Sequence, residues 1–360
     1  EAAKAHGVAN ATVDRLGRCV PHASEMPLRQ ALDRVPRGRE IPREDPPWPR
    51  VLEQAERLVG LPRHLGLHPG GIVIADTPLE RYVPLEEAAK GILCTQFEMR
   101  AVEAVGLVKI DLLGNRAIST IRETVELVEA GGGPRLDPEA FPHEDPPTAR
   151  LLSSGDSLGV FQMESPGMRN LNRMLATRDL ATAIAAVALI RPGPAASGMK
   201  ERFCRRARGL EPAGYLDPRL EPVLRGTFGV PLYEEDVMRV AAAVTGLPLE
   251  DGDVLRRAIA GGSAAAREEM RGMFLARARG NGYAPDTARA IWEGLLQFGS
   301  FAFCKAHAAG YGVLAWQAAW LKAHYPAEFA VALMNHHAGM YAKRTHLEDA
   351  RRRGVRVLLP

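Results

Sequence analysis

The hydrophobic pattern of the chain changes at Gly114, and this change limits the possible folds more than any other feature. Before Gly114, short apolar runs such as residues 72–74 and 107–113 lie between glycines, prolines and acidic residues, which is typical of short strands. After it, as far as about residue 345, apolar residues mostly recur at helical spacing. We therefore expect an α+β fold that is mostly helical, with its strands between residues 66 and 114.

The last of these strands, in the stretch GLVKIDLLGNRAIST at 106–120, carries two charges within an apolar run. Side chains alternate between the two faces of a strand, so Lys109 and Asp111 would share one face. The alternate positions are apolar and we expect them to face the core: Val108, Ile110 and Leu112. Gly114 would end the strand and Asn115 could cap the next helix. From this stretch alone, a catalytic pair and a partly exposed salt bridge are equally good interpretations.

Composition excludes several classes of protein. The four cysteines are far apart and form no CxxC pair, which argues against a disulfide framework or a zinc site and favours the cytoplasm. The longest apolar stretch, 181–190, is about half the length that spans a bilayer, and no signal peptide precedes it, so we expect no membrane association. The net charge of +3 permits a polyanionic partner without requiring one. A start at Glu1 and an end after a strand-like run lead us to expect an internal piece of a longer protein.

Two basic motifs follow the apolar stretch at residues 181–190. RPGP, which begins at Arg191, forms a rigid turn that fixes the direction of this arginine, although a plain helix stop is the more ordinary explanation. The cluster after it includes Lys200, Arg205 and Arg206. Such residues usually form a solvated helix face, and they are also the residues that contact a phosphate backbone.

Two further motifs carry cations that could bind phosphates. Arg256 and Arg257 are neighbours on an expected helix, so their side chains diverge by about 100° and could hold a polyphosphate from two sides. An equally good interpretation is that one of these two arginines forms a buried ion pair and the other is exposed to water. Lys305 and His307 lie among aromatic residues in FGSFAFCKAHAAGYG, which suits base stacking and phosphate contact but also the packing of a helix start.

Other polar residues have simpler explanations. The carboxylates at 234–236 suit the positive end of a helix dipole without a metal. In GVFQMESPGM we expect an apolar strand that leads to a capped helix. We interpret His68 as a structural turn histidine, with a smaller chance of substrate contact.

Taken in order, seven motifs make the chain resemble one family, the alpha subunit of bacterial DNA polymerase III, or C-family polymerases. They are GLVKIDLLG, GVFQMES, ALIRPGP, LYEEDVM, VLRRA, FAFCKAHAAGYG and WLKAHYPAEF. The resemblance implies a DNA-directed DNA polymerase with a palm similar to the polymerase β-type nucleotidyltransferases and a helical thumb and fingers. Residues 1–65 would match the thumb, 66–114 the second part of the palm, 115–345 the fingers, and 346–360 the start of the next segment.

The resemblance also implies roles for single residues. Asp111 matches the third of the family's three metal-binding aspartates, which together hold two Mg²⁺ ions, and Lys109 matches a lysine expected near the triphosphate. Arg256 and Arg257 match arginines that hold the phosphates of the incoming nucleotide. Residues in motifs that line the nucleotide and template side of the fingers are Arg191, Lys305 and His307. The partners implied are primer-template DNA, deoxynucleoside triphosphates, and, through regions outside this chain, the sliding clamp and other replisome subunits.

The chain departs from the family pattern in three places. The paired-aspartate motif that supplies the other two metal ligands is absent, so we expect the fragment alone to be inactive. The family's Gly-Lys-Lys after VLRRA is replaced by an AGG sequence, and its Asn-Lys-Ser-His by residues 304–307, CKAH. We therefore expect a divergent or accessory paralogue in replication or translesion repair, with an error-prone polymerase as the hypothesis to test. The alternative is a catalytically silent paralogue that binds DNA or a replisome protein.

Overall fold

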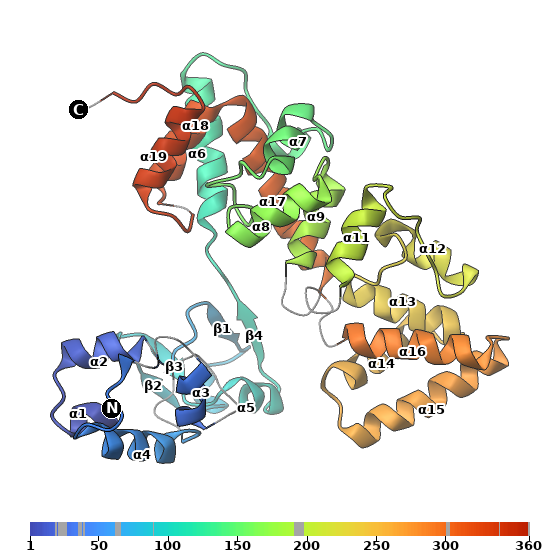
Figure 1. The fold of residues 1–360 in the computed structure, drawn as a ribbon, viewed down its shortest axis with the longest axis horizontal. Helices are drawn as coiled ribbons and strands as arrows, with labels where there is room; N and C mark the ends of the chain where they lie inside the picture. The colour runs from blue at the N-terminus through green and yellow to red at the C-terminus, as the bar shows by residue number, and fades with distance from the viewer. Residues whose placement is uncertain are drawn as a thin grey trace. The chain divides into compact units, whose positions relative to one another are not determined.

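A computed structural model of the chain describes residues 1–18, 20, 27–34, 38, 40–61, 66–88, 90–190, 198–299, 303–337 and 339–358. It divides into two compact units, Glu1–Leu113 and Gly114–Pro360, which are described separately below. Helices predominate, and the strands are short and antiparallel (Figure 1). This confirms the predicted fold class. The division falls where the hydrophobic pattern changes.

The first unit begins with helices that enclose only small clusters of apolar side chains. They are α1 (Ala2–Ala5), α2 (Asn10–Gly17), α3 (Leu28–Arg34) and α4 (Trp48–Leu58). One cluster joins Leu16, Leu32 and Leu52, and the indole of Trp48 packs against it. Each helix contributes only one or two fully buried residues, so this unit depends on several small cores.

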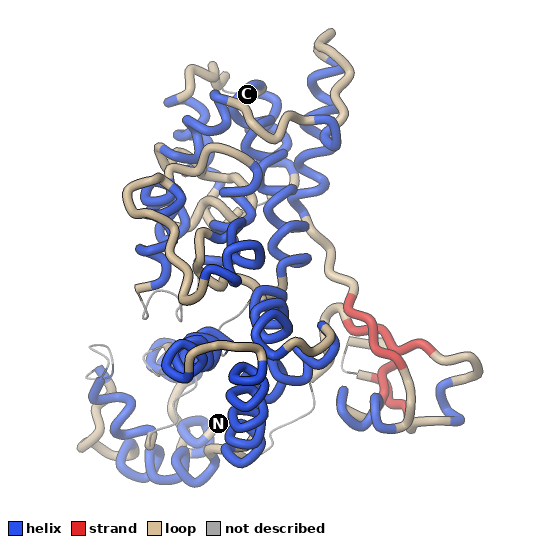
Figure 2. Tube along the Cα trace, turned by 90° about the vertical axis from the view of Figure 1, so that its right-hand side faces the viewer, coloured by secondary structure: helices blue, strands red, loops and turns tan. Residues whose placement is uncertain are grey.

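The strands of the first unit form two antiparallel sheets of two strands each, drawn in red in Figure 2. Strand β1 (Gly71–Ile74) lies antiparallel to β4 (Val108–Asp111), with Gly71 opposite Asp111. Strand β2 (Leu85–Glu87) lies antiparallel to β3 (Leu93–Thr95). Helix α5 (Met99–Ala104) precedes β4, and its Val102 packs against Val83 and Leu107.

The face of β4 that packs against the core is the opposite of the one predicted. Val108 and Leu112 are 59% and 63% exposed, whereas Leu107, on the face of the two charges, is buried. Strand β1 follows the same pattern, because Val73 packs inward and Ile72 is exposed. Both faces of this two-stranded sheet carry apolar side chains, so the sequence pattern could not tell which face α5 would cover.

The second unit is built from helices. They are α6 (Arg116–Ala130), α7 (Pro146–Ser153), α8 (Pro166–Leu175), α9 (Leu180–Leu189), α11 (Met199–Ala207), α12 (Glu221–Leu224), α13 (Glu234–Thr245), α14 (Leu249–Gly261), α15 (Ala264–Gly280), α16 (Pro285–Gly299), α17 (Lys305–His324), α18 (Pro326–Asn335) and α19 (Lys343–Arg352). The apolar side chains form two main clusters, one around α9 and α17 and one within α12–α16.

Helix α17 is the central element of the first of these clusters and contacts α6, α7, α9 and α18. Its polar side chains also hold the proline-rich segment that follows α6. The indole N–H of Trp316 donates to the Pro142 carbonyl at 2.8 Å, and the Gln317 amide donates to the Pro138 carbonyl at 3.0 Å. A segment that looks like a loop in the sequence is therefore fixed to a core helix.

Helix α19 is fixed to α17 by a buried ion pair. The Lys322 ammonium lies 2.6 Å from an Asp349 carboxylate oxygen, and the two side chains are only 3% and 10% exposed. Lys322 also donates to the carbonyls of Asp156 and Leu158, in the loop after α7. Burial lowers the pKa of Lys322 to about 8. Three segments distant in sequence therefore meet at one ammonium group.

Two local predictions in this unit are wrong. The apolar run before Glu164 forms consecutive turns and not a strand. The described residues after α19, up to Leu358, contain no strand. Pro326 follows the end of α17 and occupies the first turn of a further helix, α18, where its missing N–H costs nothing. Within the described ranges, no helix is both long and apolar enough to cross a membrane.

Candidate functional site

Lys109 and Asp111, at the end of β4, are in direct contact. The Lys109 ammonium donates a hydrogen bond to Asp111 Oδ1, and His68 Nδ1 lies 3.7 Å from the same oxygen. The Asp111 side chain is 54% exposed, whereas that of Lys109 is 16% exposed. The hydrogen bond from Lys109 lowers the pKa of Asp111, so this carboxylate is ionised at neutral pH. The result is an accessible anion beside a shielded cation.

Two glycines allow the chain to pass close to this pair. A Cβ atom on Gly71 would lie 2.8 Å from Lys109 Cε and 3.1 Å from His68 Nδ1, and one on Gly70 would lie 2.5 Å from the Leu112 carbonyl oxygen. The Gly70 amide also donates to His68 Nδ1 at 3.2 Å. His68 is therefore both the turn residue that was predicted and a neighbour of Asp111.

The described residues supply one candidate metal ligand here and not a complete metal site. Asp111 has the oxygen donor that Mg²⁺ prefers, and its exposure leaves room for an ion. Nowhere among the described residues do three or more histidine, cysteine, aspartate or glutamate side chains gather as a metal site would require. A two-metal centre would need carboxylates from outside the described residues.

Arg256 and Arg257 in the second unit share one carboxylate. Asp253 lies 2.8 Å from Arg256 and 2.5 Å from Arg257, and Arg256 also pairs with Glu234 at 3.2 Å. The Arg256 side chain is 20% exposed and that of Arg257 is 73% exposed. This arrangement matches the interpretation of one shielded and one solvated arginine, and it leaves the Arg257 guanidinium open to a ligand.

The first turn of α13 connects this arginine pair to Lys305. Glu234 pairs with Arg256, and the next residue, Glu235, accepts a hydrogen bond from the Lys305 backbone N–H at 3.0 Å. The Lys305 ammonium lies 5.4 Å from the centre of the Tyr233 ring. Two neighbouring carboxylates of α13 therefore link α14 to the start of α17, a connection that no local sequence pattern indicated.

A row of aromatic rings in tilted contact lies at the start of α17. His307 lies 5.4 Å from the Phe303 ring and 4.1 Å from the Tyr311 ring, between ring centres. Tyr311 in turn lies 5.2 Å from Phe161, which comes from the turns after α7. Phe303, His307 and Tyr311 belong to one sequence motif, but Phe161 could be added only from the three-dimensional structure.

The remaining predicted residues differ in how they are used. Lys200 and Arg205 lie near single carboxylates, Glu201 at 3.4 Å and Glu211 at 3.5 Å. Arg206 is more enclosed: it pairs with Glu211 at 3.1 Å and donates to the carbonyls of Gly214 and Phe228. Its guanidinium holds a loop together. Arg191 lies outside the described residues.

Two family models match the chain. One, described as the bacterial DNA polymerase III alpha NTPase domain, matches residues 1–114, and the other, described as the bacterial DNA polymerase III alpha subunit finger domain, matches residues 117–282. A DNA polymerase III subunit alpha of Thermus aquaticus is 37% identical over 100% of this chain and 30% of its own length. An error-prone DNA polymerase of Symbiobacterium thermophilum is 38% identical over 99% of this chain and 32% of its own length. The chain spans about a third of the length of these relatives.

Proposed function

Because the chain belongs to the bacterial DNA polymerase III alpha family, we propose that it is part of the catalytic core of a DNA-directed DNA polymerase. The observation that carries this proposal is the Lys109–Asp111 pair at the end of β4, within the segment that the NTPase-domain model matches. We use the term parent polymerase for the complete enzyme that contains this chain. Its substrates are primer-template DNA and deoxynucleoside triphosphates.

The reaction is nucleotidyl transfer. The primer 3′-hydroxyl attacks the α-phosphorus of the incoming nucleotide, a new P–O bond forms, and the bond to the leaving pyrophosphate breaks. Divalent metal ions, when bound, favour ionisation of the hydroxyl and stabilise the leaving group. Asp111 contributes one carboxylate to that centre, and other segments of the parent polymerase supply the rest. Lys109 holds Asp111 in position and offsets phosphate charge.

The second unit would bind the nucleotide and the DNA. Arg256, Arg257 and Lys305 offset the charge of the triphosphate, as cations do in phosphoryl transfer. His307 lies in the ring row, which offers stacking surfaces to bases. Lys200 and Arg205 are candidates for contact with the phosphate backbone. On this proposal, residues 1–65 act as the thumb, residues 66–114 as part of the palm and residues 115–345 as the fingers. The sliding clamp binds to other regions of the parent polymerase. The parent polymerase acts in the cytoplasm.

The experiment that tests the proposal is primer extension by the purified parent polymerase. We expect template-directed incorporation in the presence of Mg²⁺. A full-length protein that binds primer-template DNA but adds no nucleotide would contradict the proposal and favour the silent, DNA-binding paralogue. Extension past lesions and mismatches would separate an error-prone enzyme from a replicase, since relatives with both names match this chain at similar identity.

In the same assay, we expect Arg257→Ala to raise the KM for the incoming nucleotide about tenfold with a smaller change in kcat, because a charged hydrogen bond to a phosphate is lost. The matched control is Arg271→Ala, since Arg271 is also exposed and pairs with Glu268 three residues before it on the neighbouring helix α15. Its KM should stay at the wild-type value. An unchanged KM in Arg257→Ala would remove this arginine from the binding site.

A further inference from the structure

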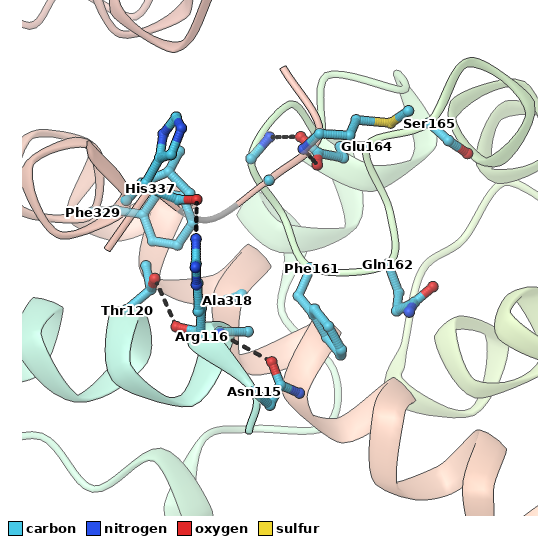
Figure 3. A pocket seen from close by; sticks show the side chains of 15 residues that line it. Asn115, Arg116, Thr120, Phe161, Gln162, Glu164, Ser165, Ala318, Phe329 and His337 are labelled. Carbon is cyan, nitrogen blue, oxygen red and sulfur yellow. Dashed lines mark hydrogen bonds between the residues drawn. The ribbon is translucent and has the colours of Figure 1, made fainter. Parts of the chain in front are cut away.

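A cavity of about 390 Å³ lies within the second unit, beside the start of α6 (Figure 3). Asn115, Arg116 and Thr120 line one side, and the turn that carries Phe161 and Gln162 lines another. The remaining wall comes from α17, α18 and the segment after it: Ala318, Phe329, Leu333, His337, Gly339 and Met340. The volume is within the range of small-molecule pockets, about 300–1,000 Å³. Apart from Phe161, which also belongs to the ring row, none of the lining residues takes part in the proposed function.

The turn at the cavity holds Gln162 in an unfavourable backbone conformation. Gln162 has a φ of 58°, in the left-handed region that costs a residue with a side chain conformational free energy. Its side chain is exposed, and among the described residues its amide has no hydrogen-bond partner. A glycine would adopt this conformation more easily, so the turn itself gives no reason for a glutamine.

The surrounding structure enforces this conformation from both ends of the turn. Val160 and Met163, which flank Phe161 and Gln162, are completely buried in the main core. The Ser157 hydroxyl donates to the Met163 carbonyl at 2.6 Å, which closes the turn from within. Phe161 and Gln162 are therefore presented by a rigid support.

Glu164 fixes the same turn to the opposite wall of the cavity. Its buried carboxylate accepts hydrogen bonds from the backbone N–H of Gly159, at 2.9 Å, and from that of Met340 (Figure 3). Both partners line the cavity, so this one carboxylate connects two of its walls. Across the cavity, Arg116 donates to the His337 carbonyl at 3.3 Å. Hydrogen bonds therefore stabilise the walls of the cavity on two sides.

The chemistry presented is an aromatic ring next to a free amide. Aromatic side chains stack on bases of any sequence, and a glutamine amide offers a donor and an acceptor that match the edge of a base. Asn115 adds a second amide; its oxygen already caps α6 by accepting from Ala117, which leaves its NH₂ group as a donor. A planar group with hydrogen-bonding edges is the ligand that fits this combination.

We propose that this cavity is a nucleobase-binding site, in which Phe161 provides the stacking surface and Gln162 contacts the edge of the base. The proposal rests on the proposed function, because a polymerase handles such bases both in free nucleotides and in DNA strands. Glu164 is a positioning residue of this site, since its carboxylate is occupied by two backbone N–H groups and holds the turn in place.

The test measures binding directly on the 360-residue chain. Two fluorescent probes distinguish the source of the base: 2-aminopurine deoxyribonucleoside triphosphate, and a single-stranded oligonucleotide with one internal 2-aminopurine. Stacking quenches the fluorescence of 2-aminopurine. We expect the wild-type chain to quench at least one probe, and Phe161→Ala and Gln162→Gly each to weaken that binding about tenfold. Inorganic triphosphate alone should not abolish the quenching.

Gln162→Gly is the decisive variant because it adds no backbone strain, so a loss of binding cannot be attributed to misfolding. Glycine relieves the left-handed conformation, so the melting temperature should rise while binding falls. The matched control is Ala176→Gly: Ala176 has a φ of 51° at the end of α8, away from the cavity, so its melting temperature should rise with binding unchanged. Wild-type affinity in Gln162→Gly, or no quenching of either probe by the wild-type chain, would overturn the proposal.

These readouts separate the two proposals. Neither probe needs to be incorporated, so a chain that binds as described within an inactive parent would contradict only the proposed function. Conversely, a parent polymerase that extends primers, with unchanged probe binding in Gln162→Gly, would contradict only the nucleobase site.

Discussion

Replacement of Asp111 by asparagine in the parent polymerase is expected to reduce nucleotide incorporation at least about a thousandfold, because a metal-binding carboxylate contributes several kcal/mol to the transition state. Asparagine keeps the shape of the side chain and can still accept the hydrogen bond from Lys109. It loses the charge, which the exposed position of Asp111 makes available to a cation. Primer extension with single-nucleotide resolution measures the loss, and fluorescence anisotropy of labelled primer-template should show nearly unchanged DNA binding.

The matched control for this variant is Asp76→Asn. Asp76 is an exposed carboxylate in the same unit, just after β1, and its pKa is also lowered, chiefly by a hydrogen bond from Tyr82. The proposal gives it no contact with metal or nucleotide, so incorporation should stay at the wild-type level. Turnover in Asp111→Asn within a few fold of wild type would refute the metal role of Asp111.

The second large effect concerns stability. Asp349→Asn is expected to lower the free energy of unfolding of the second unit by about 3–5 kcal/mol, because it leaves the buried Lys322 ammonium without its charge partner. The desolvation that already lowers the pKa of Lys322 would no longer be offset by the carboxylate. The contacts of α19 with the loop after α7 should loosen at the same time.

Urea denaturation followed by tryptophan fluorescence measures this effect, since Trp292, Trp316 and Trp320 all belong to the second unit. The control is Glu348→Gln on the same helix. Glu348 pairs with Arg351 at 2.7 Å, but both side chains are roughly half exposed, and such pairs contribute at most about 1 kcal/mol. If the two variants were equally stable, the Lys322–Asp349 pair would not be an anchor of α19.

Helices that bury a continuous apolar stripe could be predicted from the sequence. The helix expected after Gly114 corresponds to α6, and Asn115 caps it as expected by accepting from the Ala117 N–H at 3.0 Å. The turns around Val160 and Met163 could not be predicted. Both are apolar and deeply buried, as strand residues would be, but the turn between them is held by the Ser157–Met163 hydrogen bond and by the hydrogen bond from Met340, far away in the chain, to Glu164.

The same distinction applies to the candidate site. The alternation of side chains along a strand placed Lys109 and Asp111 on one face, and the structure brings them into contact. Asp253 pairs with Arg256 from three residues away on the same helix, but Glu234 and Glu235, which contact Arg256 and the Lys305 backbone N–H, come from α13. The acidic character of these two residues seemed fully explained by the helix dipole. Long-range pairs of this kind leave no local pattern, so the sequence did not indicate them.

The unequal burial of the two arginines on α14 has a consequence for how they respond to ionic strength. Both are already paired with carboxylates, and an incoming polyanion must exchange partners with them. Added salt weakens pairs in open solvent far more than shielded ones, so Arg257 will part from Asp253 at moderate salt while Arg256 stays with Glu234. If the pair binds a polyanion as proposed, we expect Arg257 to engage it before Arg256, because Arg257 is more exposed and more easily released from its carboxylate.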